Sequence, residues 1–401
     1  MMISRRPLLE RGRLVVLLAL LPLLALAQHA TGRLSVHYLN VGQADAIYIE
    51  CPEAEHHNML IDSGDLTAMR YPGSPKLFQD QLKALMGSRK HLDVVVSTHP
   101  HSDHTGSLLW VLNNFEVGTF IDDGMQYDSA TYKAIEARAK ALADAGKLKF
   151  LHATDLANNS TDSDFCPATN LDAVLVKPSN FGHDPNPNNN SVVIRLTYDQ
   201  ETFLFTGDAE TEEEALLLQD PGTKPLIAAN VLKAGHHGSN TSSSQAFLDA
   251  IHPKQVVVSA GLKDVGTNKG YKHPRAETIR RFLQYTADNG TQQQRMIDAF
   301  DTAKNEWTTV QINKGIYDTA LDGTVVLLSD GQNTWNEADA PPSDGTATGV
   351  VAPSTVSYVY TKGSKVYHFA DCADARNIKS ENRIESSTPP KGKELHRGCP
   401  R

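Results

Sequence analysis

The segment between residues 98 and 106 constrains this chain most, because three histidines and an aspartate fall within six residues. These residues are His99, His101, Asp103 and His104. They follow an apolar run, residues 94–97, that reads as a buried strand. Imidazole nitrogens and carboxylate oxygens are ligands that suit zinc, manganese or iron. Because the strand fixes the start of the loop, His99 and His101 can point the same way. The pattern therefore predicts a metal site.

The order His-x-His-x-Asp-His after a strand resembles the metal-binding signature of the metallo-β-lactamase-fold hydrolases. The resemblance implies an α/β fold, an αββα sandwich in which two sheets lie between two layers of helices. It also implies one or two metal ions, zinc or manganese, along one edge, where they activate a water for hydrolysis.

Two later strands end in residues that the resemblance assigns to the same centre. Residues 202–206 lead into Asp208, which would bridge two metals because each carboxylate oxygen can take one cation. Residues 230–234 lead into His236 and His237. His236 would be the last ligand of the second metal. His237 would ligate, orient the water or donate a proton to the leaving oxygen.

Other residues would support the site. Asp62 ends a strand and would orient a ligating histidine through a hydrogen bond. Many relatives have a third metal-binding histidine near residues 186–191, where this chain has Asn190 and Ser191 in supporting positions. The first metal is then one protein ligand short, and His183 is the nearest histidine. His273 would contact the substrate phosphate, complete a metal shell or cap a helix.

The hairpin expected at residues 34–49 and the run at residues 231–261 resemble the hydrolase domain of ComEC-type DNA-uptake proteins. The resemblance covers about residues 34–331, and a last hairpin is expected at residues 319–327. It implies a phosphodiesterase or nuclease in which Asp103, His237 and His273 act catalytically.

The N-terminus is typical of a targeting segment. Four arginines precede an apolar run at residues 14–26, and residues 25–27 offer a small-x-small cleavage site. The prediction is a signal peptide at residues 1–27, similar to a twin-arginine signal, with an uncleaved anchor as the alternative. The mature protein would be secreted or periplasmic, with no stable membrane span. Four cysteines permit two disulfides there without revealing the pairing.

The sequence of the C-terminal region predicts a separate small module. Residues 336–354 are rich in proline, glycine, alanine, serine and aspartate and predict a linker between a hydrolase domain at 31–335 and a module at 355–401. A hairpin is expected about residues 362–363. The module carries two histidine–cysteine pairs: His368 with Cys372, and His396 with Cys399. They fit either a structural zinc site or a disulfide between the two cysteines.

Composition leaves several functions open. The net charge of −9 gives no general sign of polyanion binding. The favoured hypothesis is that the protein is an exported metal-dependent phosphodiesterase or nuclease that acts on extracytoplasmic DNA. The alternatives are a metallo-hydrolase of another ester or amide, such as a phosphocholine ester, lactone or β-lactam, and a non-catalytic protein that binds DNA or cell wall. The sequence does not indicate the oligomeric state.

Overall fold

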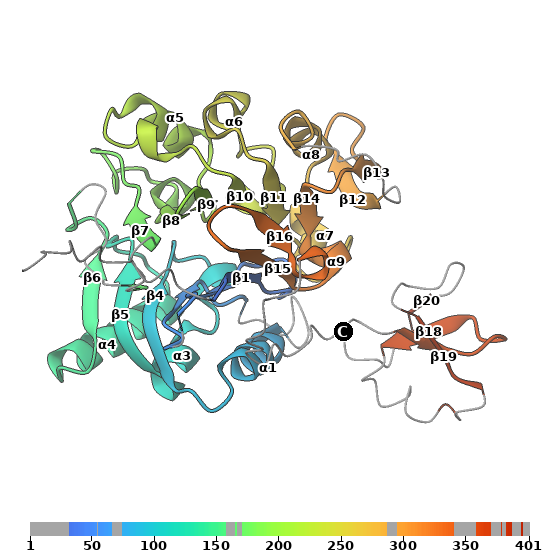
Figure 1. The fold of residues 1–401 in the computed structure, drawn as a ribbon, viewed down its shortest axis with the longest axis horizontal. Coiled ribbons are helices and arrows are strands. Elements are labelled where there is room, and N and C mark those ends of the chain that lie inside the picture. The colour runs from blue at the N-terminus through green and yellow to red at the C-terminus, as the bar shows by residue number, and fades with distance from the viewer. Residues whose placement is uncertain are drawn as a thin grey trace, which may run out of the picture.

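The computed structural model describes residues 32–53, 55–65, 74–157, 165–166, 171–286, 295–340, 358–369, 378, 382–386 and 394–395. The predicted signal peptide and most of the predicted linker lie outside this part of the chain. Two large sheets dominate the described part, with helices on their outer faces (Figure 1). This arrangement confirms the predicted αββα sandwich.

The first sheet holds eight strands and carries the metal loop. In spatial order they are β16 (Thr334–Asn336), β15 (Val325–Ser329), β1 (Leu34–Tyr38), β2 (Ile47–Glu50), β3 (Asn58–Ile61), β4 (His91–Val96), β5 (Glu116–Asp122) and β6 (Lys149–His152). β1 and β2 pair antiparallel, which confirms the expected hairpin. β3 to β6 run parallel, so the loops that follow β3, β4 and β5 leave the sheet at one edge.

The second sheet holds six strands. In spatial order they are β14 (Ile316–Asp318), β11 (Gln255–Val258), β10 (Val231–Lys233), β9 (Glu201–Phe205), β8 (Ile194–Tyr198) and β7 (Leu171–Leu175). β9, β10 and β11 are parallel neighbours. The loops after β9 and β10 therefore leave at a common edge, and these are the loops predicted to carry Asp208 and the paired histidines.

Alternation along the strands explains why the apolar runs are continuous. In β4, Val94 and Val96 join the core between the sheets, whereas Val95 packs with Phe78 of α1 (Ser74–Met86) and its neighbours on the outer face. Strands covered on both faces need apolar side chains at every position. α3 (Leu108–Asn114) and α4 (Ala130–Asp144) also cover the first sheet.

The second sheet is covered in the same way by three helices. They are α5 (Thr211–Gln219), α6 (Gln245–Ile251) and α8 (Ala276–Phe282), which pack on Leu204 and Leu232. Shorter elements lie between these, including η2 (Lys224–Leu226), α7 (Asn268–Tyr271) and the antiparallel pair β12 (Arg295–Asp301) and β13 (Glu306–Ile312). Among the described residues, no helix combines the length and apolar content needed to cross a bilayer.

One local prediction is wrong. Residues 319–327 do not form a hairpin, because Asp318 accepts hydrogen bonds from the backbone N–H groups of Ala320 and Leu321 and so starts a helical turn, α9 (Thr319–Asp322). The hairpin lies further on, between β15 and β16. The first sheet consequently extends to Asn336, and η4 (Glu337–Asp339) follows it.

A disulfide joins Cys51 to Cys166, with their Cα atoms 5.6 Å apart. Both cysteines are buried in the core between the sheets. The bond closes a loop of 115 residues, a separation the sequence did not allow us to assign.

The C-terminal module contains a small sheet. β17 (Tyr358–Tyr360) and β18 (Val366–Phe369) pair antiparallel, as expected, and β19 (Ile384–Ser386) joins β17. β20 (Glu394–Leu395) runs parallel to β18, pairing Leu395 with Tyr367, the residue before His368. The other three residues of the expected zinc or disulfide set, Cys372, His396 and Cys399, lie outside the described residues, so both alternatives remain predictions.

Candidate metal centre

The predicted metal loop leaves β4 as the sequence suggested. His99 is fully buried, and its Nε2 lies 3.1 Å from Nδ1 of the more exposed His101. The chain then turns into α2 (Ser102–Thr105), which carries Asp103 in its first turn and the buried His104. All four predicted residues of this loop therefore converge on one edge of the first sheet.

Asp62 holds this loop in place. Its Oδ1 accepts a hydrogen bond from the Thr98 backbone N–H at 2.8 Å, and its Oδ2 lies 2.7 Å from Nδ1 of His104. With Nδ1 engaged in this way, His104 presents Nε2 to the centre. A carboxylate that fixes a ring in this manner is common behind ligating histidines.

The carboxylate of Asp208, which follows β9 of the second sheet, faces histidines that come from both sheets. Four imidazole nitrogens surround its Oδ2: His104 Nε2 at 3.2 Å, His237 Nε2 at 3.4 Å, His236 Nε2 at 3.8 Å and His99 Nε2 at 4.0 Å. Neutral imidazole lone pairs facing a carboxylate oxygen repel it. Nδ1 of His104, His236 and His237 already faces an oxygen acceptor, so their Nε2 atoms carry no proton in the neutral rings. The arrangement is favourable only when additional cations, either protons or metal ions, lie among these atoms.

The pKa values of Asp208 and His237 show that, without metal, protonated histidines balance the buried carboxylates. Burial alone would raise the pKa of Asp208, but His104, His237 and His236 hold it well below its ordinary value. Burial alone would lower the pKa of His237, yet Asp208 and Asp45 outweigh burial and raise it to about 10. A divalent cation would take over the charge that these protons supply.

The two adjacent histidines of η3 (Gly235–Gly238) differ in burial and in the groups that they contact. His237 is buried, its Nδ1 lies 2.9 Å from the Ser259 carbonyl oxygen, and its Nε2 lies 3.4 Å from Oδ2 of Asp103. His236 keeps 20 % of its side chain exposed, and its Nδ1 lies 2.8 Å from Oε1 of Glu210. The sequence predicted His236 as the last ligand of the second metal and left His237 as a ligand, a water-orienting group or a proton donor. The compact group around Asp208 contains His237.

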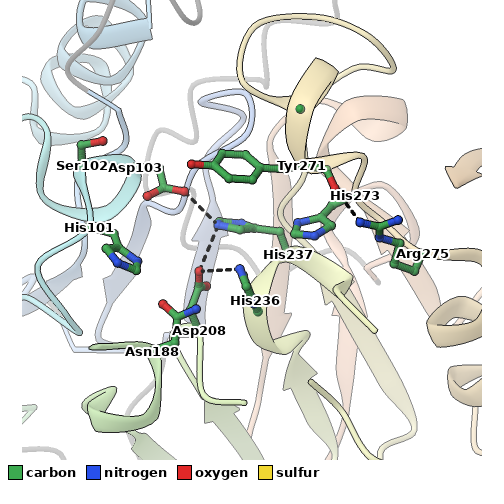
Figure 2. Close-up of a pocket in the computed structure, with 11 residues that line it drawn as sticks. His101, Ser102, Asp103, Asn188, Asp208, His236, His237, Tyr271, His273 and Arg275 are labelled. Atoms are coloured by element: carbon green, nitrogen blue, oxygen red, sulfur yellow. Dashed lines mark hydrogen bonds and ion pairs between the residues drawn. The ribbon is translucent and has the colours of Figure 1, made fainter. Parts of the chain in front are cut away.

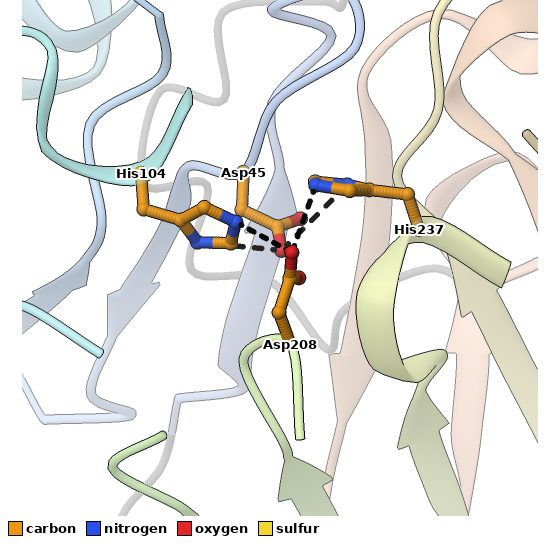
Figure 3. A group of neighbouring side chains, drawn as sticks. All are labelled: Asp45, His104, Asp208 and His237. Atoms are coloured by element: carbon orange, nitrogen blue, oxygen red, sulfur yellow. Dashed lines mark ion pairs between the residues drawn. The ribbon is translucent and has the colours of Figure 1, made fainter. Parts of the chain in front are cut away.

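That compact group also includes a residue that the sequence analysis missed. Asp45, in the loop between β1 and β2, joins His104, Asp208 and His237 in a buried cluster whose ligand atoms all lie within 4.8 Å of one another (Figure 3). The sequence offered one sign of this role, because Asp45 is a carboxylate that lies between two alanines in a largely apolar loop. The cluster fits a divalent cation, because imidazole and carboxylate are established metal ligands.

A buried lysine completes the charge balance. Lys233, at the end of β10, is 1 % exposed and forms an ion pair with Asp45. Its Nζ also donates to the Gly207 carbonyl oxygen at 2.8 Å and lies 3.7 Å from Oδ1 of Asp208. A lysine inside an apolar strand was the sequence signal for this role, since buried charges need partners.

The centre opens into a cavity of about 480 Å³ (Figure 2). Its lining is His101, Ser102, Asp103, Asn188, Asp208, His236, His237, Gly270, Tyr271, His273 and Arg275. The buried His273 belongs to this wall, where its ring centroid lies 5.2 Å from that of His236 and its Nδ1 lies 3.3 Å from Nε2 of Gln43. The cavity therefore combines the metal-ligand set with a cationic side chain, Arg275.

The two supporting residues predicted near 190 lie behind the cavity. Ser191 accepts a hydrogen bond through Oγ from the Asp208 backbone N–H at 3.1 Å. Asn190 bonds to the backbone of Asp184 and so shapes its own loop. His183 on that loop is exposed and does not line the cavity.

Comparisons with known proteins identify the family of the chain. Residues 39–261 match the family model described as the metallo-beta-lactamase superfamily. ComE operon protein 3 from Bacillus subtilis is 26 % identical over 278 residues, which are 65 % of this chain and 33 % of that protein. Competence protein ComA from Neisseria gonorrhoeae is 40 % identical over 87 residues, 22 % of this chain and 12 % of that protein.

This chain therefore spans about a third or less of the length of either relative. Among solved structures, the metallo-beta-lactamase fold protein YhfI from Bacillus subtilis aligns over 63 % of this chain and 94 % of its own, with a TM-score of 0.36 and 12 % identity. The family match covers more than half of the chain and includes the metal loop, Asp208 and both histidines of η3. The chain belongs to the metallo-β-lactamase superfamily and is related to the competence proteins.

Proposed function

We propose that this chain is an exported, metal-dependent phosphodiesterase that cleaves DNA outside the cytoplasm. The observation that carries the proposal is the set of four imidazole nitrogens around Oδ2 of Asp208 at the base of an open cavity. Relationship to the competence proteins supports a nucleic acid as the substrate.

Two divalent ions would share the carboxylate of Asp208. His99 and His101 would hold the first ion, while Asp103, His104 and His237 would hold the second, next to Asp45. When bound, the ions supply a water of lowered pKa and neutralise the charge of a phosphodiester.

Side chains of the cavity wall complete the proposed chemistry. Arg275 would bind a phosphate oxygen of the substrate, because guanidinium matches phosphate geometry. His236 is the most exposed of the four histidines around Asp208, its Nδ1 is held by Glu210, and its Nε2 would deliver a proton to the leaving oxygen from the edge of the cavity. His273 would steady the same region of the substrate from the neighbouring wall.

Export is part of the proposal. The predicted signal peptide at residues 1–27 supports it, and so does the Cys51–Cys166 disulfide, because disulfides persist in oxidising compartments. A secreted or periplasmic enzyme would meet DNA before uptake or during its turnover.

The test uses purified chain without the signal peptide, loaded with manganese or zinc. We expect hydrolysis of bis(p-nitrophenyl) phosphate and of single- or double-stranded DNA, and loss of both after chelation. Asp208→Ala is the control for contaminating nucleases. Turnover of a lactone or a β-lactam without any phosphodiester hydrolysis would overturn the proposal, and metal binding without turnover of any substrate would favour a binding protein.

A further inference from the structure

Asn188 lies where the sequence leaves the first metal one ligand short. It belongs to η1 (Pro187–Asn190), is 5 % exposed and lines the cavity with His101 and Asp208 (Figure 2). Its side-chain oxygen, Oδ1, accepts no hydrogen bond from any residue that the structure describes. A buried carbonyl oxygen in a folded protein normally has a partner, so this atom requires one.

Glu210 determines which end of the Asn188 amide faces the cavity. Oε1 of Glu210 accepts a hydrogen bond from Nδ2 of Asn188 at 3.0 Å. An ionised carboxylate can only accept, so the nitrogen of the amide must point to Glu210 and the oxygen must point elsewhere. The same Oε1 lies 2.8 Å from Nδ1 of His236, which also lines the cavity. One carboxylate oxygen thus anchors two cavity-lining side chains from behind.

We infer that Oδ1 of Asn188 is a ligand of the first metal ion and replaces the third histidine found in many relatives. The inference rests on the proposed metal centre. With His99, His101 and Asp208, the first site then has two nitrogen and two oxygen donors. Carboxamide oxygen is a harder ligand than imidazole and suits manganese better than zinc. The first site should therefore favour manganese over zinc more than it would with a third histidine in place of Asn188.

The experiment measures metal binding rather than activity. Protein stripped of metal with a chelator is titrated with manganese and with zinc in competition with a fluorescent chelator. The number of bound ions per chain is measured by inductively coupled plasma mass spectrometry. We expect two ions per wild-type chain. Asn188→Ala should lower the manganese affinity of one site by about 10- to 100-fold and leave the other site unchanged. His183→Ala is the matched control, because it removes the rival histidine of the same loop and should retain both ions.

A second variant covers the case in which Asn188→Ala does not fold. Asn188→His supplies an imidazole at the same position and should raise zinc affinity relative to manganese at one site. Two unchanged sites in folded Asn188→Ala, or an unchanged metal preference in Asn188→His, would overturn the inference and leave the proposed function standing. A wild-type chain that binds no metal would overturn both.

Discussion

The two walls of the metal centre are built differently. The first wall is the loop and short helix after β4, where His99, His101, Asp103 and His104 come from six consecutive residues. The second wall is assembled from three separate places. They are Asn188 in η1, Asp208 after β9, and the end of β10, where Lys233 is followed by the histidines of η3. Asp45 adds a group from a hairpin loop of the first sheet.

Spacing in the sequence predicts the first wall better than the second. On the first wall a single strand fixes the direction of the loop, so the spacing of the residues already determines which side chains meet. On the second wall the choice between neighbours depends on the backbone. His236 and His237 both have positive φ, 45° and 54°, and their rings turn to different partners, Glu210 and Asp103. Spacing alone cannot separate two such residues.

The largest effect is expected at the junction of the two walls. Asp208→Ala should lose both metals and lower phosphodiester turnover by about a thousandfold or more, comparable with the loss of a strong transition-state contact. The reason is that His104 of the first wall and His237 of the second wall both face its Oδ2. Metal counting with steady-state kinetics checks this. Two ions retained in the folded variant would break the idea that the walls share this carboxylate.

Stability should depend on the buried charge pair beside the centre. Lys233→Met leaves the carboxylate of Asp45 buried without its cation and should reduce the free energy of unfolding by about 3–5 kcal/mol. Denaturant unfolding of the metal-free chain measures this effect. The double variant Asp45→Asn with Lys233→Met should recover part of the loss, because it removes both charges together. A double variant as unstable as the single one would indicate that packing of the lysine stem, rather than charge, is responsible.

The two histidines of η3 offer the sharpest test of the second wall. His237→Ala should weaken metal binding by about 10- to 100-fold, because Nε2 of His237 faces Asp103 and Asp208 from a buried position. His236→Ala should keep both metals and lose mainly turnover. Chelator competition separates the two outcomes. If His236→Ala loses a metal instead, His236 is the ligand predicted from the sequence, and the proton-donor role proposed for it is wrong.

Much of the fold could be predicted from the sequence, because the pattern of apolar residues along a strand depends on which of its faces are covered. Apolar residues at every position of residues 94–96 indicated a strand covered on both faces, and the structure places it there. The short helix at 319–322 was missed because Asp318 acts as a cap, a local hydrogen bond that competes with strand pairing. Asp45, Lys233 and Asn188 were missed because their importance comes from neighbours more than 20 residues away.

A smaller effect is expected behind the first wall. Asp62→Asn should weaken metal binding by about tenfold, because the amide keeps the shape of the carboxylate but loses the charge that orients His104. The backbone N–H of Thr98 can still bond to the amide oxygen, so the loop should fold normally. Calorimetric titration of folded variant and wild type measures the change. An unchanged affinity would mean that the backbone alone fixes the ring of His104.

The smallest effect on the metal centre is expected from a carboxylate outside both walls, Asp318, which should change stability with pH but not metal binding. Burial, with the nearby charge of Asp322, raises the pKa of Asp318 to about 7 in the folded protein, whereas the unfolded chain has the ordinary value of 3.8. The folded state therefore binds this proton more tightly. Its contribution to stability is fully present at about pH 4 and is lost as the pH rises to about 7.

Asp318→Asn cannot titrate, yet its amide oxygen can still accept from the N–H groups of Ala320 and Leu321. The variant should match the wild type near pH 4 and exceed it by up to about 4 kcal/mol at pH 8, because the pKa is raised by about three units and each unit corresponds to about 1.4 kcal/mol. Denaturant unfolding at both pH values measures this. Asp318→Ala is the control, because it loses the cap and should be less stable than Asp318→Asn at both pH values. A constant difference between Asp318→Asn and wild type across this range would show that the carboxylate stays ionised in the fold.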